Sequence, residues 1–467
     1  MRYGSTRGVA ASRPFDGVLL AGLAEDGGLF VPESWPVFSP AEWRAMRGLP
    51  YASLAARVME PFMCGGAVSF GDLQAMCRAA YRAFDHAAVV PLVQLDRDLF
   101  ALELFHGPTL AFKDLALQLA GRLFDHVLQA RDERVTIIGA TSGDTGSAAI
   151  EACRDRERVD IAILHPEGRT STVQRRQMTT VLAPNVLNIA VQGTFDDCQD
   201  LVKAMFADAP FRDELRMSAV NSINWARIAG QIPYFAAAAL ALGAPDRPVG
   251  VAVPTGNFGN VLAAWAAKQM GLPIERLIVG SNSNDILARF LASNDMRMAG
   301  VVETVSPSMD IQVSSNFERL LFEFLHRDAA ATARIMADFR ATGRMAVPEP
   351  VWQAVRREFA GFALDDAATL AEIARIKQDY GYIADPHSAI GIAAARACAP
   401  VGLPVIAAAT AHPAKFPDAM ERAIGTRPGL PSRLAHLYDK AEQFHRAPAA
   451  LADIETMIRR FANRNSV

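Results

Sequence analysis

The side chain best suited to covalent chemistry in this sequence is Lys113, which lies in the segment Glu103–Asp114 (ELFHGPTLAFKD). Only six of the 47 basic residues are lysines, and Lys113 is the first of them along the chain. An amine can lose its proton and condense with an aldehyde to form an imine, whereas a guanidinium stays protonated. Lys113 opens a leucine-rich helical run, and an apolar helix start lowers the pKa of an amine. Imine chemistry and a half-buried lysine whose head reaches water fit this segment equally well.

Two glycine-rich turns are suited to binding anions. Thr141–Gly146 (TSGDTG) and Gly256–Asn260 (GNFGN) each follow an apolar run and precede a predicted helix. Helix N-termini present free N–H groups and the positive end of the helix dipole. Neither turn has the spacing of a Walker A loop or of a dinucleotide-binding turn. Taken alone, each is also explained by the steric need for glycine between a strand and a helix.

A third polar segment, Asn221–Arg227 (NSINWAR), lies between these two turns. If the chain turns into a helix near Asn224, then Asn221, Ser222 and Arg227 converge on one oxyanion, with the guanidinium providing a bidentate grip. The alternative is a capped helix with an arginine on its surface, because Asn and Ser are good N-cap residues.

Thr410 directly follows an apolar run near the end of the chain, and its hydroxyl suits hydrogen bonding to a neutral ring nitrogen. Lys415 lies five residues further on and is the rival candidate for the imine. We expect His412, between them, to be structural, since the sequence places no nucleophile beside it.

Apolar strand-like runs alternate with helical segments from about residue 98 onward. This rhythm predicts parallel sheets with helices on both faces. In such sheets ligands bind at the carboxyl ends of the strands, where the polar segments lie. The predicted strands cover residues 135–138, 161–164, 186–191, 249–253, 277–279 and 405–409. Residues 312–380 are predicted to be mainly helical, and 450–463 to form a terminal amphipathic helix.

Composition narrows the class of protein. A chain of 467 residues with 51% hydrophobic and 21% charged residues is expected to fold into two or three globular domains. A net charge of −3 without long charged runs indicates neither a nucleic-acid patch nor a membrane-surface patch. The five cysteines lack the spacing of a disulfide framework or a metal site, and the N-terminus lacks the apolar core of a signal peptide. We therefore expect a cytoplasmic protein without metal ligands, and no stretch long and apolar enough to span a membrane.

The order of the motifs resembles the threonine synthase family, whose members are pyridoxal-phosphate enzymes of the tryptophan-synthase-β-like fold, or fold type II. The resemblance covers nearly the whole chain and includes a long N-terminal unit typical of one branch of the family. Its motifs are YGSTRG (3–8), DGGLFVP (26–32), HGPTLAFKD (106–114), TSGDTG (141–146), NSINWAR (221–227), TGNFGN (255–260), DPHSA (385–389) and TAHPAKF (410–416).

The resemblance implies an α/β protein with two parallel-sheet domains and an N-terminal lead-in unit. The lead-in would cover residues 1–95, and a large cofactor-binding domain would combine 96–130 with 235–430. A small mobile domain would cover 131–234, and 431–467 would form a C-terminal helical segment. The resemblance does not fix the oligomeric state, which we expect to be a monomer or a homodimer.

Roles for single residues follow from the same resemblance. Lys113 would hold pyridoxal 5'-phosphate as an imine and then serve as the catalytic base and acid. Other cofactor contacts would come from Phe112, Asp144, Gly256, Asn257, Phe258, Gly259, Asn260 and Thr410. The substrate carboxylate would bind Thr141, Ser142 and Thr145, and the substrate phosphate would bind Asn221, Ser222 and Arg227, with Lys415 as a secondary phosphate contact.

Asp144 departs from the pattern of many relatives, which carry an asparagine near the cofactor's 3-hydroxyl. A carboxylate there repels a phenolate oxygen unless one of the two groups is protonated.

The implied reaction converts O-phospho-L-homoserine and water to L-threonine and phosphate, the last step of threonine biosynthesis. Phosphate leaves the γ carbon and the hydroxyl arrives at the β carbon, so protons must move between neighbouring carbons. Two alternatives remain at this stage. One is another fold-type-II lyase, such as a threonine or serine dehydratase or a related phospholyase. The other is an inactive cofactor-binding relative, and the retention of Lys113 in an arginine-dominated chain weighs against it.

Overall fold

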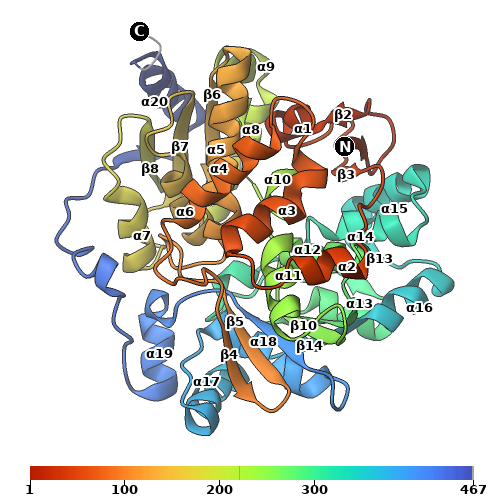
Figure 1. Ribbon diagram of the computed structural model, residues 1–467. Coiled ribbons are helices and arrows are strands. Elements are labelled where there is room, and N and C mark those ends of the chain that lie inside the picture. Colours follow the sequence, from red (N-terminus) through yellow and green to blue (C-terminus); the bar gives the residue numbers. More distant parts are fainter. Residues whose placement is uncertain (220, 465–467) are drawn as a thin grey trace.

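Two separate parallel sheets organise the computed structural model, which describes residues 1–219 and 221–464 (Figure 1). The predicted α/β fold is therefore confirmed. All six predicted strands are present, with their ends extended by up to three residues, apart from the one at 405–409, which has the predicted bounds.

The larger sheet has six strands in the order β14-β11-β10-β15-β5-β4, parallel except for β4, which runs antiparallel to β5 at one edge. Alternate residues of the central strands enter two different cores. Val251 and Val253 face one core, whereas Ala252 packs with the helices of the opposite face. Burial on both faces explains why these strands are continuously apolar in sequence. The strands are β4 (Leu92–Asp96), β5 (Leu99–Glu103), β10 (Val249–Pro254), β11 (Ile274–Ser281), β14 (Phe359–Ala363) and β15 (Val405–Ala409).

Helices cover both faces of this sheet. One face packs against α12 and its neighbours, and the other against α17 and α18. The helices of this part of the molecule are α5 (Lys113–Arg131), α11 (Ile232–Ala241), α12 (Gly259–Gln269), α13 (Ile286–Ser293), α14 (Phe317–Phe324), α15 (Ala329–Thr342), α16 (Glu349–Glu358), α17 (Asp366–Tyr380), α18 (Pro386–Cys398) and α19 (Pro417–Ile424).

The smaller sheet has five parallel strands in the order β16-β8-β7-β6-β9. Its edge strand β16 (His445–Pro448) comes from the C-terminal segment, which was expected to be only helical. The following α20 (Leu451–Arg464) lies beside this sheet and α8 (Figure 1). Its Ile454 and Ile458 are buried in one cluster with residues of β7, β8 and α8. The remaining elements are β6 (Val135–Ala140), β7 (Val159–Pro166), β8 (Val186–Gln192), β9 (Met217–Ser218), α6 (Asp144–Cys153), α7 (Thr172–Thr179), α8 (Phe195–Ala207) and α9 (Ala209–Glu214).

The N-terminal lead-in unit shares its hydrophobic core with the rest of the molecule. Tyr3, Trp43 and Phe62 belong to the same buried cluster as Trp225 and the central strands of the large sheet. The unit contains a three-stranded antiparallel sheet, in the order β2-β1-β3, and four helices. These are β1 (Arg2–Ser5), β2 (Arg13–Pro14), β3 (Phe30–Pro32), α1 (Phe15–Ala21), α2 (Pro40–Ala45), α3 (Tyr51–Met63) and α4 (Phe70–Tyr81).

The segment 312–380 is mainly helical, as predicted, but it also contributes strand β14. Phe359–Ala363 (FAGFA) is short, and the pattern of its surroundings is helical, so its local sequence carries little strand signal. It becomes a strand because it pairs with β11, with Leu277 opposite Phe359. Sheet pairing between distant segments overrides local propensity here. The same region contains β13 (Arg344–Met345), which pairs with β12 (Met296–Arg297).

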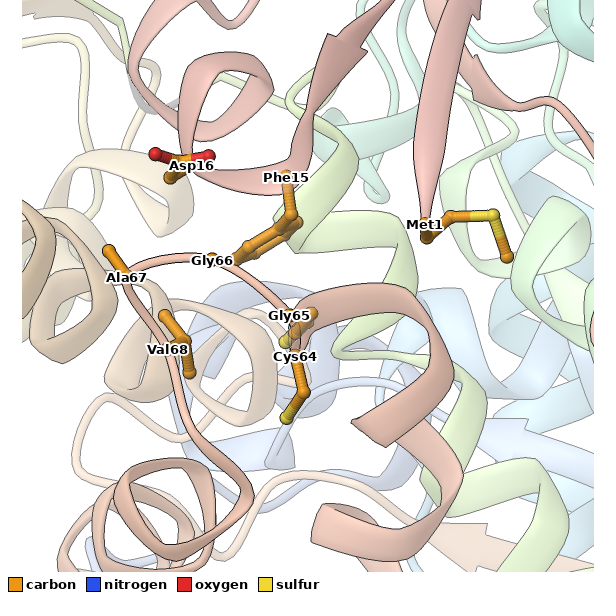
Figure 2. Close-up of a pocket in the computed structure, with 9 residues that line it drawn as sticks. Met1, Phe15, Asp16, Cys64, Gly65, Gly66, Ala67 and Val68 are labelled. Atoms are coloured by element: carbon orange, nitrogen blue, oxygen red, sulfur yellow. The ribbon is translucent and has the colours of Figure 1, made fainter.

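A small pocket lies between the N-terminus, α1 and the turn that joins α3 to α4 (Figure 2). Met1, Phe15, Cys64 and Val68 are among the residues that line it. None of its lining residues belongs to the predicted site. No described helix is long and apolar enough to cross a membrane.

Candidate active site

Three adjacent strands of the large sheet bring the predicted cofactor residues to one edge. Strands β10, β15 and β5 are neighbours, and their carboxyl ends lead to the Gly256–Asn260 turn, to Thr410 and to the segment before Lys113. The backbone N–H of Phe112 donates to the carbonyl of Thr410 at 2.9 Å. The Lys113 segment is thus fastened to the strand end that carries Thr410.

The turn before Lys113 is shaped by the buried Asp114. Its carboxylate accepts hydrogen bonds from the backbone N–H of Thr109, at 2.8 Å, and from the Thr109 hydroxyl, at 2.7 Å. Burial raises the pKa of Asp114 to about 6, although the bonds from Thr109 oppose this shift. The bonds fix the chain where it enters α5, whose first residue is Lys113.

Lys113 is almost buried and makes only long polar contacts. Its side chain is 11% exposed, and Nζ lies 3.5 Å from Oδ2 of Asp144 and 3.3 Å from Oγ of Ser308. Burial lowers the pKa of Lys113, and the charges of Lys415 and Arg227 act in the same direction, against the opposing effect of Asp144. A lowered pKa and loose contacts both favour a free amine that is able to react.

Asp144 lies at the centre of a buried polar network. Its Oδ1 lies 2.6 Å from Nζ of Lys415 and accepts a hydrogen bond from Gln174 at 2.8 Å. Its Oδ2 accepts one from Ser308 at 3.1 Å. Burial alone would raise the pKa of Asp144, but the positive charges of Lys415 and Lys113 hold it well below its usual value. Asp144 is therefore a carboxylate in this site.

Lys415, the rival candidate for the imine, is fully buried and closely engaged. Besides its ion pair with Asp144, its amine donates to the carbonyl of Thr109 at 2.7 Å. The looser amine of Lys113 is the better candidate for covalent attachment.

Ser308, His387 and Asp385 join this network, and nothing in the sequence pointed to a role for Ser308. His387 Nδ1 lies 2.9 Å from Asp385 Oδ1, and His387 Nε2 accepts from the backbone N–H of Ser308 at 3.3 Å. Asp385 and His387 stand in the DPHSA motif of the resemblance. Ser308 lies in the short turn η1 (Pro307–Met309), inside an irregular loop that carries no sequence signal of its own.

The Gly256–Asn260 turn contributes mainly its backbone. Phe258 adopts φ of 63° while its side chain is buried in the core against Phe317. The Asn260 carboxamide oxygen accepts from the Thr255 hydroxyl at 2.9 Å within the turn. Helix α12 begins at Gly259. A helix start leaves its first N–H groups without backbone acceptors, and here the N–H of Val261 donates to the Asn260 side chain at 3.0 Å.

The Thr141–Gly146 turn lies at the end of β6 and at the start of α6. Thr141 Oγ1 accepts from the N–H groups of Gly143, at 3.0 Å, and Gly146, at 2.9 Å. Because the Thr141 oxygen is the acceptor in both bonds, its hydroxyl hydrogen can still be donated to a ligand. Gly143 has φ of 147°, and a Cβ there would lie 2.5 Å from Gln174, so this position requires glycine. Ser142 is exposed and Thr145 is half-buried.

The Asn221–Arg227 segment does turn into a helix after Asn224. Asn224 caps α10 (Trp225–Ala229) by accepting from the N–H of Ala226 at 3.0 Å. Arg227 is 4% exposed, so it is not the surface residue of the alternative. Its Nε and Nη1 are buried with no hydrogen-bond partner among the described residues, and burial lowers its pKa to about 10. Ser222 is half-buried, and Asn221 is exposed.

Asn316 connects this segment to the Gly256–Asn260 turn. Its side-chain amide donates to the carbonyls of Ser222 and Asn257, each at 3.0 Å. The neighbouring Ser315 hydroxyl donates to the Asn257 side chain at 3.0 Å. The sequence predicted neither contact, although the polar run SSN (314–316) before α14 was visible in it.

Comparison with known proteins agrees with this arrangement along the whole chain. Three family models match: threonine synthase N terminus (residues 2–81), pyridoxal-phosphate dependent enzyme (84–337) and threonine synthase, C-terminal (388–458). A threonine synthase from Pseudomonas aeruginosa is 52% identical over 466 residues, which cover 99% of each chain. The chain belongs to the threonine synthase family.

Solved structures of this family share the fold. The crystal structure of a PLP-bound threonine synthase from Brucella melitensis has a TM-score of 0.97 and 51% identity, and covers 99% of each chain. The yeast threonine synthase structure has a TM-score of 0.94 at 36% identity, again over 99% of each chain. The chain is accordingly a pyridoxal-phosphate-dependent lyase of fold type II.

The residues at the strand ends fit pyridoxal phosphate. The cofactor needs an amine for its aldehyde, a phosphate site and a partner for its ring nitrogen. Lys113 offers a buried amine with only long contacts, α12 offers a helix start, and Thr410 offers a hydroxyl on the strand between them. Among the described residues no group of three or more His, Cys, Asp or Glu is arranged to hold a metal ion.

Proposed function

We propose that this chain converts O-phospho-L-homoserine and water to L-threonine and phosphate. Its membership of the threonine synthase family supports this reaction, and the buried Arg227 is the observation that carries the substrate assignment. An unpaired guanidinium in a protein interior is costly, so it marks a place where an anion binds. The substrate phosphate is such an anion, and Ser222 beside Asn316 supplies a hydroxyl near the same segment.

Lys113 is proposed to hold the cofactor and to carry protons between the reacting carbons. Bound pyridoxal phosphate supplies an electron sink for charge that develops on the substrate carbons. A flexible amine with a lowered pKa is suited to taking a proton from one carbon and returning it to the next. Phe112, whose ring centroid lies 5.9 Å from Nζ of Lys113, is proposed to pack beside the cofactor ring.

The remaining polar groups are proposed to divide between cofactor and substrate. The Gly256–Asn260 turn would hold the cofactor phosphate, Thr410 the ring nitrogen, and Asp144 would lie near the 3-hydroxyl. Substrate contacts would come from Thr141, Ser142 and Thr145 for the carboxylate, and from Asn221, Ser222 and Arg227 for the phosphate. The hydroxyl donor left on Thr141 supports the carboxylate assignment.

We further propose the division into a lead-in unit (1–95), a large domain (96–130 with 235–430), a small mobile domain (131–234) and a C-terminal segment (431–467). The separate sheets support a large and a small domain.

The proposed setting is the cytoplasm, where five cysteines without disulfides fit a reducing environment. The active form is proposed to be a monomer or a homodimer.

The test is phosphate release from O-phosphohomoserine by the purified protein and by Arg227→Ala. Losing one partner of a buried charge-assisted contact costs about 2–5 kcal/mol. We therefore expect kcat/KM for the phosphorylated substrate to fall at least about tenfold. The visible spectrum of the bound cofactor should stay unchanged, because Arg227 belongs to a different segment from the Gly256–Asn260 turn. A suitable control is Arg396→Ala, which removes an arginine paired with Glu372 outside the site.

The Arg227→Ala variant also distinguishes the proposed reaction from that of a dehydratase. Any slow activity on unphosphorylated serine or threonine should fall much less in Arg227→Ala, since those substrates carry no phosphate. Equal losses on both kinds of substrate would make Arg227 a structural residue or a carboxylate ligand. The dehydratase function would then replace the one proposed.

A further inference from the structure

The ammonium of Lys415 is fully buried and already bonded to Asp144 and Thr109, so we do not assign it the secondary phosphate contact that the family resemblance implied. Burying such a charge costs several kcal/mol unless it is paired and hydrogen-bonded. Both requirements are met by residues around the reactive lysine. The amine lies 2.6 Å from Oδ1 of Asp144 and donates to the carbonyl of Thr109, four residues before Lys113.

Asp144 has two oxygens with different neighbours. Oδ1 faces Lys415 and Gln174, at 2.6 and 2.8 Å, whereas Oδ2 faces Ser308 at 3.1 Å and Lys113 at 3.5 Å. The carboxylate therefore pairs closely with Lys415 and only loosely with Lys113. Without Lys415, the nearest cation to this buried carboxylate would be the amine that has to react.

We propose that Lys415 is a positioning residue that neutralises Asp144, so that the amine of Lys113 faces a compensated carboxylate and stays in its reactive free-base form. The proposal deepens the proposed function, because it rests on Lys113 as the attachment point. It also removes the difficulty that a carboxylate poses beside a phenolate oxygen. A carboxylate already paired with an ammonium tolerates such an oxygen far better than a bare one.

Charged and polar groups from several elements surround Lys113 and together influence its pKa. Asp144 faces it from α6, Lys415 from the turn η2 (Pro413–Lys415), and Arg227 from α10. Uncharged Ser308 lies between Lys113 and His387 of α18. Burial and the charges of Lys415 and Arg227 lower the pKa of Lys113, and the carboxylate of Asp144 raises it, so removal of Lys415, the cation paired with Asp144, should raise this pKa.

The experiment measures covalent attachment of pyridoxal phosphate to the cofactor-free full-length chain, followed by visible absorbance at a series of pH values. In this step the nitrogen of Lys113 attacks the aldehyde carbon, and the carbonyl oxygen leaves as water. Only the free amine attacks, so the attachment rate rises with pH through the pKa of Lys113. In Lys415→Met this curve should move to higher pH. The rate at neutral pH should fall at least about tenfold, because an uncompensated opposite charge shifts a neighbouring pKa by about 1–3 units.

Removing the negative charge of Asp144 instead of the positive charge of Lys415 provides the decisive comparison. Asp144→Asn leaves Lys415 uncompensated, so its attachment curve should move to lower pH. The double variant Asp144→Asn/Lys415→Met should return close to the parent curve. Lys268→Met, which removes a lysine paired with Glu358 at 2.8 Å at the far end of α12, should leave the curve unchanged.

An unchanged curve in Lys415→Met would overturn the proposal. So would a double variant that remains as slow as Lys415→Met, because Lys415 would then be needed for structure alone. If Lys415→Met does not fold, the Asp144→Asn variant still tests the proposal. An attachment curve of Asp144→Asn that stays in place or moves to higher pH would overturn it. Attachment needs no substrate, so these outcomes are independent of phosphate release from O-phosphohomoserine.

Discussion

At the scale of single residues, the proposed site assigns different roles to its two lysines. Lys113, which is almost buried, and Lys415, which is fully buried, both lie beside Asp144, yet their Nζ atoms lie 3.5 and 2.6 Å from its carboxylate. The looser contact leaves Lys113 free to bond to the cofactor, and the tighter one holds Lys415 in place. The roles that we propose for the two lysines therefore rest on geometry and not on residue type.

Replacing Lys113 tests this division. Lys113→Ala should abolish both the visible absorbance band of the attached cofactor and all turnover, while the fold remains. Lys113→Arg should have the same result, because a guanidinium keeps positive charge but forms no imine. Borohydride reduction followed by peptide mapping locates any remaining attachment. A reducible bond in either variant would move the attachment point to Lys415.

The sequence pointed to the candidate site residues but not to the residues that hydrogen-bond to them. Lys113, Arg227 and the glycine turns carry unusual residue types or spacings that are visible without a structure. Ser308 and Asn316 are a common serine and a common asparagine, and they matter only because a turn and a helix start bring them next to Asp144 and Asn257. Contacts between segments that are far apart in sequence leave no local pattern to read.

At the scale of elements, helix α7 of the proposed small domain contacts both Asp144 and the segment before Lys113. Gln174 donates to Asp144 at 2.8 Å, and Gln177 donates to the carbonyl of Thr109 at 3.1 Å. The first bond lies within the proposed small domain, and the second crosses to the Lys113 segment. A rotation of the small domain would therefore change the contacts that cross and keep those within it.

We expect the small domain, with its Thr141–Gly146 turn, to rotate toward the large domain when substrate binds. Closure would exclude water until phosphate has left, which protects the intermediate stage of the reaction. Crystal structures with and without a phosphonate analogue of the substrate provide the measurement. The two states should differ by a rigid rotation of residues 131–234, and superimposable structures would exclude this motion.

At the scale of the whole molecule, the alternating apolar runs were sufficient to predict parallel sheets covered by helices, and the family resemblance implied two of them. They did not predict which strands form the edges. Strand β14 was hidden in a helical segment, and β16 comes from beyond the large domain to extend the small sheet. Edge strands are short and carry little pattern of their own, so their partners determine them.

The lead-in unit is tied to the site by buried charges as well as by its core. Arg7 makes two hydrogen bonds to Glu318, at 3.1 and 3.0 Å, and the Thr6 hydroxyl donates to the same carboxylate at 2.6 Å. The next residue, Arg319, donates to the carbonyls of Phe30 and Ile223, at 2.9 and 2.6 Å. Through these bonds the start of α14 joins the N-terminal arm to the segment that carries Arg227.

Removing Arg7 should therefore destabilise the whole molecule. The Glu318 side chain is only 4% exposed, and breaking a buried pair leaves an uncompensated charge that costs about 3–5 kcal/mol. Urea denaturation of Arg7→Met should show a loss of this size in the free energy of unfolding. Arg57→Met is the matched control, because it breaks a surface pair with Glu60 worth less than about 1 kcal/mol.

A second variant identifies the cause of the loss. In Arg7→Met/Glu318→Met the buried charge is gone, and replacing a buried ion pair by apolar side chains is often nearly neutral. This double variant should recover most of the stability that Arg7→Met loses. If Arg7→Met behaves like the surface control, the lead-in unit is held by its hydrophobic core alone, and the Arg7–Glu318 pair does not fasten it to the segment that carries Arg227.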